Sequence, residues 1–218
     1  MTSFTEENYL KAIYKLGGAE NVPVSTNSIA DRLNTKAASV TDMLKKLAEK
    51  KLIHYKKYQG VFLSAGGKKI AIRIIRKHRL WELFLVEKLN FKWDEVHEMA
   101  EQLEHIESGE LIERLNKFLG YPTHDPHGDP IPDKEGNFAP SHSKQLSSLT
   151  KNASATMTGV VDHSPVFLQY LDKLKLKIGQ KIEIREINEF DRSVLISVNG
   201  GASFQLSKDA ASNILVKQ

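Results

Sequence analysis

Apolar residues near the N-terminus recur every three to four positions in three successive stretches, residues 4–16, 25–33 and 36–51. This spacing places the apolar side chains on one face of an α-helix, so the chain is predicted to begin with three helices. The second and third helices are separated only by Asn34-Thr35. Two short helices joined by a tight turn form the helix-turn-helix pattern.

Two short apolar runs follow, at residues 52–53 and 61–63, and predict the strands of a hairpin. Residues 55–60 between them are Tyr-Lys-Lys-Tyr-Gln-Gly, which predicts a basic and aromatic tip. A helix-turn-helix followed by such a hairpin is the arrangement of a winged helix, a module typical of DNA-binding proteins.

The pattern then changes three times. Residues 70–89 and 94–119 predict two longer helices, and residues 121–140, which hold five of the seven prolines, predict an irregular connection. A Ser/Thr-rich segment precedes a short helix and several short alternating strands, which predict a small β-barrel. The fold class is therefore mainly α with a small all-β C-terminal domain. The expected divisions are a DNA-binding domain at 1–72, a second helical domain at 73–140, a poorly packed linker at 141–158 and the β domain at 159–218.

The chain has 218 residues and no cysteine. A disulfide framework, a thiol nucleophile, a zinc ribbon and an iron–sulfur cluster are thereby excluded. No apolar run approaches the roughly 18 residues of a membrane span, and the N-terminus lacks the order of a signal peptide. We therefore expect a cytoplasmic protein without a membrane partner.

Charge is distributed unevenly. Residues 1–76 contain 14 lysines and arginines against six acidic residues, whereas residues 77–113 contain four against ten. A basic block beside an acidic block indicates two kinds of partner, one anionic and one cationic.

The basic block supplies the candidate DNA contacts. Short polar side chains on a major-groove helix read base edges, and clustered basic side chains neutralise phosphates. The candidates are Ser25, Thr26, Lys36, Ser39, Thr41, Asp42, Lys45, Lys46, Lys56 and Lys57.

The acidic block carries the candidate metal ligands. On a helix that advances about 100° per residue, His97, Glu101, Glu104 and His105 fall within an arc of about 100°. No lysine or arginine lies between Trp93 and Leu111 to offset this charge. A divalent cation removes the repulsion, and oxygen and nitrogen ligands suit Mn(II), Fe(II), Co(II), Ni(II) or Zn(II). The alternative is an acidic surface helix. His78 and Glu82 form a further pair spaced i, i+4 on one face of the preceding helix.

Four segments together resemble the diphtheria-toxin-repressor family of metal-dependent transcriptional repressors, including its manganese-sensing branch. They are NYLKAIYKL at 8–16, RKHRLWELFL at 76–85, VHEMAEQLEH at 96–105 and PHGDPIP at 126–132. The resemblance implies a winged helix-turn-helix, a helical metal-binding and dimerisation domain and an SH3-like barrel. It also implies a homodimer that binds a palindromic operator in double-stranded DNA when metal is bound.

The same resemblance implies three sets of ligands. The primary site would use Asn8, Glu101, Glu104 and His105, and the ancillary site would use His78, Glu82 and His97. In relatives with a longer C-terminus a further set includes a proline-rich loop and the last domain, here Asp125 and His127 with Asp162 or His163.

Two positions depart from the family pattern. Asn8 stands where methionine or aspartate is usual, and Glu101 stands where the iron-sensing branch has cysteine. Because a hard carboxylate fits manganese better than a thiolate would, Mn(II) is favoured. Fe(II) is the alternative, and Zn(II), Co(II) and Ni(II) are expected to bind in vitro.

Two other functions fit parts of the pattern. A metallohydrolase would use the His/Glu stripe, but the stripe lacks the HExxH order and a base separate from the ligands. A metal-independent winged-helix regulator would use the acidic helix as a dimer interface. A metal-dependent repressor without a small-molecule substrate or catalytic residue explains both charge blocks.

Overall fold

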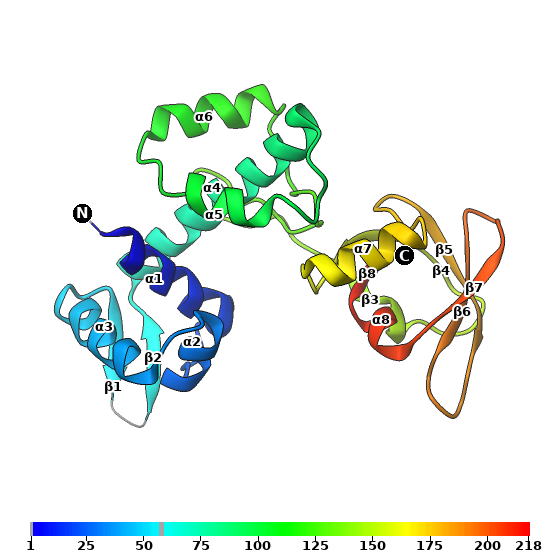
Figure 1. The fold of residues 1–218 in the computed structure, drawn as a ribbon, viewed down its shortest axis with the longest axis horizontal. Helices are drawn as coiled ribbons and strands as arrows, with labels where there is room; N and C mark the ends of the chain where they lie inside the picture. Colours follow the sequence, from blue (N-terminus) through cyan, green and yellow to red (C-terminus); the bar gives the residue numbers. More distant parts are fainter. Residues whose placement is uncertain (1, 57–58) are drawn as a thin grey trace. The chain divides into compact units, whose positions relative to one another are not determined.

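The computed structural model describes residues 2–56 and 59–218 (Figure 1). The chain forms two compact units. The first unit consists of Met1–His78, Glu101–Ile112 and Pro132–Phe138, and the second consists of Arg79–Ala100, Glu113–Ile131 and Ala139–Gln218.

The first unit contains the three N-terminal helices and the hairpin that the sequence predicts. They are α1 (Phe4–Gly17), α2 (Thr26–Arg32), α3 (Ala37–Glu49), β1 (Ile53–Lys56) and β2 (Gly60–Leu63). Ser3 begins α1 with a capping box, in which its side chain accepts from the Glu6 amide while the Glu6 carboxylate accepts from the Ser3 amide. The apolar faces meet in one core, with Leu10, Ile29, Val40 and Leu44 inaccessible to solvent. The winged helix-turn-helix is therefore confirmed.

The hairpin differs from the prediction at its tip. The strands extend to Lys56 and Gly60, with antiparallel register from Ile53↔Leu63 to Lys56↔Gly60. The tip is therefore shorter than residues 55–60, because paired backbone groups continue beyond the apolar run. Lys57 lies outside the described residues, and the side chain of Lys56 is not described.

Helix α4 (Ala65–Leu89) begins five residues before the predicted start at Ile70. The added first turn contains Gly66 and Gly67, and the Ser64 hydroxyl accepts from the Gly67 amide at 3.1 Å and caps the helix. A Cβ atom at Gly67 would overlap with the Leu52 carbonyl oxygen. The glycine is therefore required by the close approach of this first turn to the hairpin.

The predicted single helix over residues 94–119 is wrong. The structure has two helices, α5 (His97–Leu103) and α6 (Gly109–Phe118). Glu104 and His105 leave the helix in a turn, and the Ser108 hydroxyl accepts from the Leu111 amide and begins α6. Two of the four polar residues assigned to one helical stripe therefore lie beyond the end of α5.

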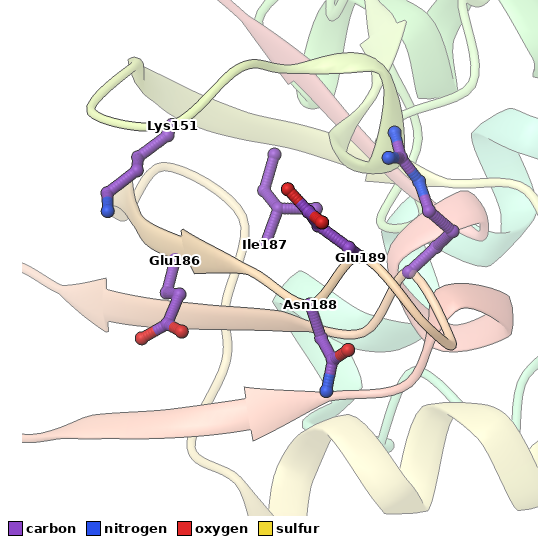
Figure 2. Close-up of a pocket in the computed structure, with 6 residues that line it drawn as sticks. Lys151, Glu186, Ile187, Asn188 and Glu189 are labelled. Atoms are coloured by element: carbon purple, nitrogen blue, oxygen red, sulfur yellow. The ribbon is translucent and has the colours of Figure 1, made fainter.

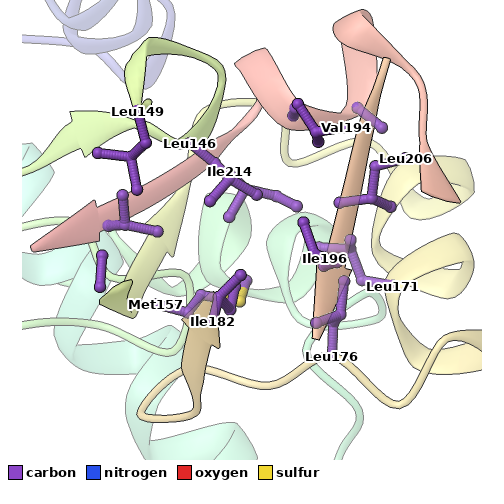
Figure 3. Close-up of a cluster of buried hydrophobic side chains, with 14 of the residues drawn as sticks. Leu146, Leu149, Met157, Leu171, Leu176, Ile182, Val194, Ile196, Leu206 and Ile214 are labelled. Atoms are coloured by element: carbon purple, nitrogen blue, oxygen red, sulfur yellow. The ribbon is translucent and has the colours of Figure 1, made fainter. Parts of the chain in front are cut away.

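The second unit contains the C-terminal β domain, a six-stranded sheet in the order β3-β8-β4-β5-β6-β7. Asn199 and Gly200 both have positive φ angles, 50° and 73°, as a tight hairpin turn between β6 and β7 requires. Figure 3 shows the buried side chains, including Met157, Ile182, Ile196 and Ile214, that fill the interior of the domain. The elements are β3 (Lys144–Gln145), the 3-10 helix η1 (Leu146–Ser148), β4 (Ser154–Val160), α7 (Pro165–Lys173), β5 (Lys181–Ile187), β6 (Val194–Val198), β7 (Ser203–Leu206), α8 (Lys208–Ser212) and β8 (Ile214–Lys217).

Residues 144–158, expected to belong to a poorly packed linker, are part of this domain. Strand β4 pairs with β5 and β8, and Leu146 and Met157 are fully buried. The Ser and Thr residues between them alternate with apolar residues, so one face of the strand is buried while the other stays polar. The other boundaries, at 72/73 and 140/141, stay predictions. None of the described helices is long and apolar enough to cross a membrane.

The close approach at Gly67 gives a test of the first unit. We expect Gly67→Ala to lower the free energy of unfolding by about 1–3 kcal/mol, the usual cost of forcing extra atoms into a packed site. The matched control is Gly109→Ala, because an added Cβ at that helical glycine meets nothing within 4 Å. Denaturant unfolding measures both, and equal stability of the two variants would contradict the packing argument.

Candidate metal centres and DNA-binding surface

Helix α3 presents the polar surface expected of a recognition helix. Ser39, Asp42, Lys45 and Lys46 are exposed, whereas Val40 and Leu44 face the core. Lys36 precedes the helix as its exposed N-cap. This segregation leaves short polar and basic side chains on one open face, as base and phosphate contacts require.

Several DNA-contact candidates also have contacts within the protein. Ser25 caps α2 by accepting from the Ser28 amide, and half-buried Thr41 donates its hydroxyl hydrogen to the Ala37 carbonyl oxygen at 3.0 Å. Lys45 lies 3.2 Å from Asp42, and Lys46 lies 3.4 Å from the buried carboxylate of Glu6. Thr26, at the start of α2, is half-buried.

The first candidate metal centre, here called the Glu104 cluster, consists of Glu7, Lys11, His78, Glu101, Glu104 and His105. Glu104 is completely buried. His78 donates from Nδ1 to Glu104 Oε2 at 2.7 Å and lies 3.9 Å from Glu101 Oε1. The structure therefore brings Glu101, Glu104, His105 and His78 together in one place, although two of them have left the helix that was expected to align them.

Lys11 changes the charge of this cluster. Its ammonium donates to Glu101 Oε1 at 2.6 Å and to the two oxygens of Glu104 at 2.6 and 2.8 Å. The expectation of uncompensated carboxylates is therefore wrong, because a lysine 90 residues earlier supplies the cation that the acidic segment lacks.

Glu7 orients the His105 ring. His105 Nδ1 donates to Glu7 Oε2 at 2.7 Å, and its Nε2 lies 3.8 Å from Glu104 Oε1. Phe4 stacks on the same ring with centroids 4.6 Å apart. A carboxylate on one imidazole nitrogen fixes the tautomer and leaves the other nitrogen as the metal ligand.

Asn8 contributes an unsatisfied oxygen. Its Oδ1 atom is buried and has no hydrogen-bond partner among the described residues. A buried amide oxygen without a donor is costly, and a cation would satisfy it.

The second candidate metal centre, here called the Glu82 cluster, consists of Glu82, Asp125 and His127. One ligand atom from each lies within 4.8 Å of the others, and all three residues are buried. His127 Nε2 donates to the Trp93 carbonyl oxygen at 2.8 Å. Its Nδ1 is buried without a hydrogen-bond partner and lies 3.6 Å from Glu82 Oε2. The residues fit a divalent cation, because the backbone carbonyl fixes the ring and leaves Nδ1 facing a carboxylate.

Asp125 organises the proline-rich loop. Its Oδ1 accepts from the amides of His127 and Asp129 at 2.9 and 3.0 Å, while Oδ2 lies 3.6 Å from Arg79 Nε. Arg79 also binds Asp129 Oδ2 at 2.6 Å and the Pro130 carbonyl oxygen. The irregular loop is thus held in place by side-chain contacts.

The pKa values of Asp125 and His127 are both raised in this cluster. Burial and the carboxylates of Glu82 and Asp129 raise the pKa of Asp125 to about 7, although His127 and Arg79 act in the opposite direction. Burial lowers the pKa of His127, but the Glu82 and Asp125 carboxylates more than offset it and raise the value to about 9. Without metal, a protonated imidazole is the cation of this cluster.

The remaining candidates lie in the second unit, and two of them, His97 and His163, contact the Glu82 cluster. His97 Nδ1 lies 3.3 Å from Glu82 Oε1. The ring of His163 stacks on that of His127 with centroids 4.6 Å apart, and Asp162 Oδ1 accepts from the Ser164 amide. The grouping of these residues as ligands stays a prediction.

Sequence reasoning missed Glu7 as a partner of the cluster and Arg79 as a loop anchor. Glu7 lies next to the candidate Asn8, and Arg79 is adjacent to His78. Their proximity to candidate ligands was a signal, but nothing in the sequence gave the direction of their side chains.

The C-terminal domain has a pocket of different character (Figure 2). Its lining carries charges of both signs and no histidine, so it resembles neither metal cluster. The residues are Lys151, Glu186, Ile187, Asn188, Glu189 and Arg192.

The raised pKa of His127 predicts the pH dependence of the metal-free protein. Because the folded state binds this proton more tightly than the unfolded state, the stabilisation is complete below about pH 6.5 and is lost as pH rises through about 9. We expect thermal unfolding in chelator to show this fall in the wild type but not in His127→Gln.

The control is His124→Gln, an exposed histidine of the same loop. It should keep the wild-type fall between pH 6.5 and 9. The raised pKa of Asp125 also makes the folded state less stable as pH rises, but this loss is complete by about pH 7, below the range in which His127 loses its proton. A wild-type melting temperature that stays constant from pH 7 to 9 would contradict the assignment of a protonated His127.

Comparison with known proteins identifies three matching segments. Residues 1–61 match the model of the iron dependent repressor, N-terminal DNA binding domain. Residues 64–133 match the iron dependent repressor, metal binding and dimerisation domain, and residues 144–218 match the FeoA domain.

Individual proteins agree with these matches. The iron-dependent repressor IdeR of Mycobacterium leprae is 33% identical over 161 residues, which cover 72% of this chain and 70% of that protein. A solved manganese-dependent transcriptional repressor in complex with manganese is 32% identical, with a TM-score of 0.87 over 97% of this chain and 98% of that one. The structure of the manganese regulator SloR is 34% identical, with a TM-score of 0.76 over 98% of each chain.

Proposed function

This chain belongs to the iron-dependent repressor family of metal-dependent transcriptional regulators, and on that premise we propose that it represses metal-homeostasis genes by binding a palindromic operator as a metal-loaded homodimer. The family consists of regulators, and we assign no catalytic residue and no small-molecule substrate. Since its target is DNA, we place it in the cytoplasm.

The observation that carries this proposal is the position of α1 between the recognition helix and the Glu104 cluster. On one side, Glu6 accepts from Lys50 at 2.8 Å and lies 3.4 Å from Lys46, at the C-terminal end of α3. On the other side, Glu7 and Lys11 contact His105 and Glu104. A change in the cluster therefore acts on the helix that positions α3.

We propose that Asn8, Glu101, Glu104 and His105 hold one divalent cation, and that Glu82, Asp125 and His127 hold another, with Asp162 or His163 as a further ligand. The ancillary set that the resemblance implies, His78, Glu82 and His97, stays a prediction. When bound, a divalent cation supplies positive charge to buried carboxylates and a preferred arrangement of ligands. If the arrangement that binds DNA has a higher affinity for the cation than the arrangement that does not, cation binding increases its population.

Mn(II) is the proposed physiological metal and Fe(II) is the alternative. Every proposed ligand is an oxygen or a nitrogen, and the chain has no cysteine thiolate, so hard or borderline cations are favoured. The manganese in the related solved repressor supports this choice, whereas the iron-dependent IdeR supports the alternative. Zn(II), Co(II) and Ni(II) are expected to bind in vitro.

Exposed apolar side chains of the second unit support the proposed dimer. Leu89, Phe118 and Tyr121 of the second unit are 52%, 65% and 64% exposed, and such exposure of large apolar side chains indicates a contact surface. A two-fold dimer places two recognition helices on two half-sites, which is why a palindromic operator is expected.

The C-terminal domain is proposed to stabilise the second centre. Gly128 of the loop lies against Gly159, where a Cβ on either residue would meet the other's backbone. The Val160 amide donates to the His127 carbonyl oxygen at 2.9 Å. The β domain thereby fixes the backbone that carries His127, and we assign it no DNA contact.

The test measures metal-dependent binding to the DNA upstream of the gene that encodes this chain. We expect Mn(II) to increase the affinity of the wild type for DNA. In the double variant Glu104→Gln/His105→Ala, the DNA affinity in Mn(II) should be at least about 100-fold lower than that of the wild type. Loss of an outer-shell partner of a metal ligand already costs about 10–100-fold in metal affinity or activity, and these substitutions remove two proposed ligands themselves. Gel-shift titrations with Mn(II), Fe(II), Zn(II) and chelator measure it.

The control is Glu98→Gln, which removes an exposed acid of α5 outside both clusters and should keep the full metal response. Sedimentation and circular dichroism establish that the variants remain folded dimers. Wild-type binding that chelator leaves unchanged would instead support a metal-independent winged-helix regulator.

A further inference from the structure

The position of the Lys11 ammonium in the Glu104 cluster resembles that of a bound cation. It lies between two carboxylates, 2.6 Å from Glu101 Oε1 and 2.6 and 2.8 Å from the oxygens of Glu104. The side chain of Lys11 is 7% exposed and that of Glu104 is fully buried. All three hydrogen bonds of the ammonium are therefore made to the carboxylates proposed as metal ligands.

These contacts have a physical reason. Two carboxylates in a buried place repel each other, and the repulsion is strong because little water screens it. The ammonium offsets that charge and satisfies three acceptor positions. The cluster is therefore ordered by a cation that belongs to the chain.

A divalent cation needs the same oxygen lone pairs. An ammonium at hydrogen-bond distance from both carboxylates would stand within a few ångströms of the ion, and two positive charges so close repel strongly. The lysine stem is long and flexible, so the ammonium can leave while α1 stays in place.

We infer that Lys11 is an internal competitor for the Glu104 cluster: its ammonium holds Glu101 and Glu104 in the metal-free protein and must be displaced before they hold a divalent cation. This inference rests on the proposed function, since it concerns the regulation of the same site. Lys11 thereby sets the concentration of free metal at which the site fills, and it keeps α1 docked when metal is absent.

The inference predicts opposite effects on stability and on metal affinity. Lys11→Met keeps the apolar stem but removes the charge, so the metal-free protein loses the ion pairs while the site loses its competitor. We expect a lower melting temperature in chelator and at least a tenfold tighter Mn(II) affinity. The matched control is Lys15→Met, which removes the same charge from an exposed position one turn later on α1.

The affinities are measured by calorimetric titration of Mn(II) into the full chain. All proteins carry His127→Gln, which removes a proposed ligand of the other centre and isolates the Glu104 cluster. The inference is supported if the Lys11 variant binds Mn(II) more tightly than the Lys15 variant does. It is also supported if the Lys11 variant binds Mn(II) and the Lys15 variant shows no binding. Equal or weaker binding by the Lys11 variant, or no binding by either, overturns it.

Gel shifts with the same variants separate this inference from the proposed function. If Lys11→Met binds Mn(II) more tightly but DNA binding of the wild type ignores metal, the inference holds and the proposed function fails. If metal controls DNA binding of the wild type but Lys11→Met changes neither affinity nor melting temperature, only the inference fails.

If Lys11→Met does not fold, NMR spectroscopy of the wild type tests whether metal displaces the Lys11 ammonium. The ammonium of Lys11, protected by three hydrogen bonds, should give a resolved ¹H–¹⁵N signal in the metal-free protein. Zn(II), which is diamagnetic, should shift the ring signals of His105 and remove the ammonium signal together. An unchanged ammonium signal while the His105 ring responds to Zn(II) would show that both cations fit, and would overturn the inference.

Discussion

A carboxylate without access to solvent requires positive charge or hydrogen-bond donors beside it, and Glu104 is such a carboxylate. Lys11 reaches it from α1 and His78 reaches it from α4. The compensation of this one charge therefore ties together three segments that are far apart in the sequence. The helix α5 ends immediately before Glu104, so the residue lies in a turn rather than on a regular helical face.

Helix α1 contacts both the Glu104 cluster and the C-terminal end of α3. Adjacent carboxylates of its first turn point in different directions, since Glu6 contacts Lys50, which directly follows α3, while Glu7 contacts His105. Adjacent residues on a helix point about 100° apart, so one turn can contact two neighbouring elements. Glu6 also completes the capping box with Ser3, and the start of α1 is therefore fixed by the same residue that contacts α3.

The Glu82 cluster also contains buried carboxylates, and a histidine rather than a lysine compensates their charge. It buries two carboxylates with an imidazole whose pKa is raised to about 9. The cluster depends on a loop without regular secondary structure, which Asp125 and Arg79 stabilise through backbone contacts. The positive charge beside the carboxylates is a protonated imidazole at this cluster and the Lys11 ammonium at the Glu104 cluster.

The sequence by itself determined the three N-terminal helices, the hairpin and most C-terminal strands, because periodicity of apolar residues is a local property of the chain. It also determined that no cysteine thiolate is available and that the candidate ligands carry oxygen and nitrogen donors, which suit a hard or borderline cation. It placed Gly66-Gly67 outside a helix and residues 141–158 in a linker, because glycine and serine weaken a local pattern whatever their tertiary contacts. Only the tertiary structure decided that Gly67 approaches Leu52 and that Met157 is buried. It alone decided that Lys11 neutralises Glu101 and Glu104 across 90 and 93 residues, because charge compensation depends on which side chains packing brings together and sequence spacing does not encode that distance.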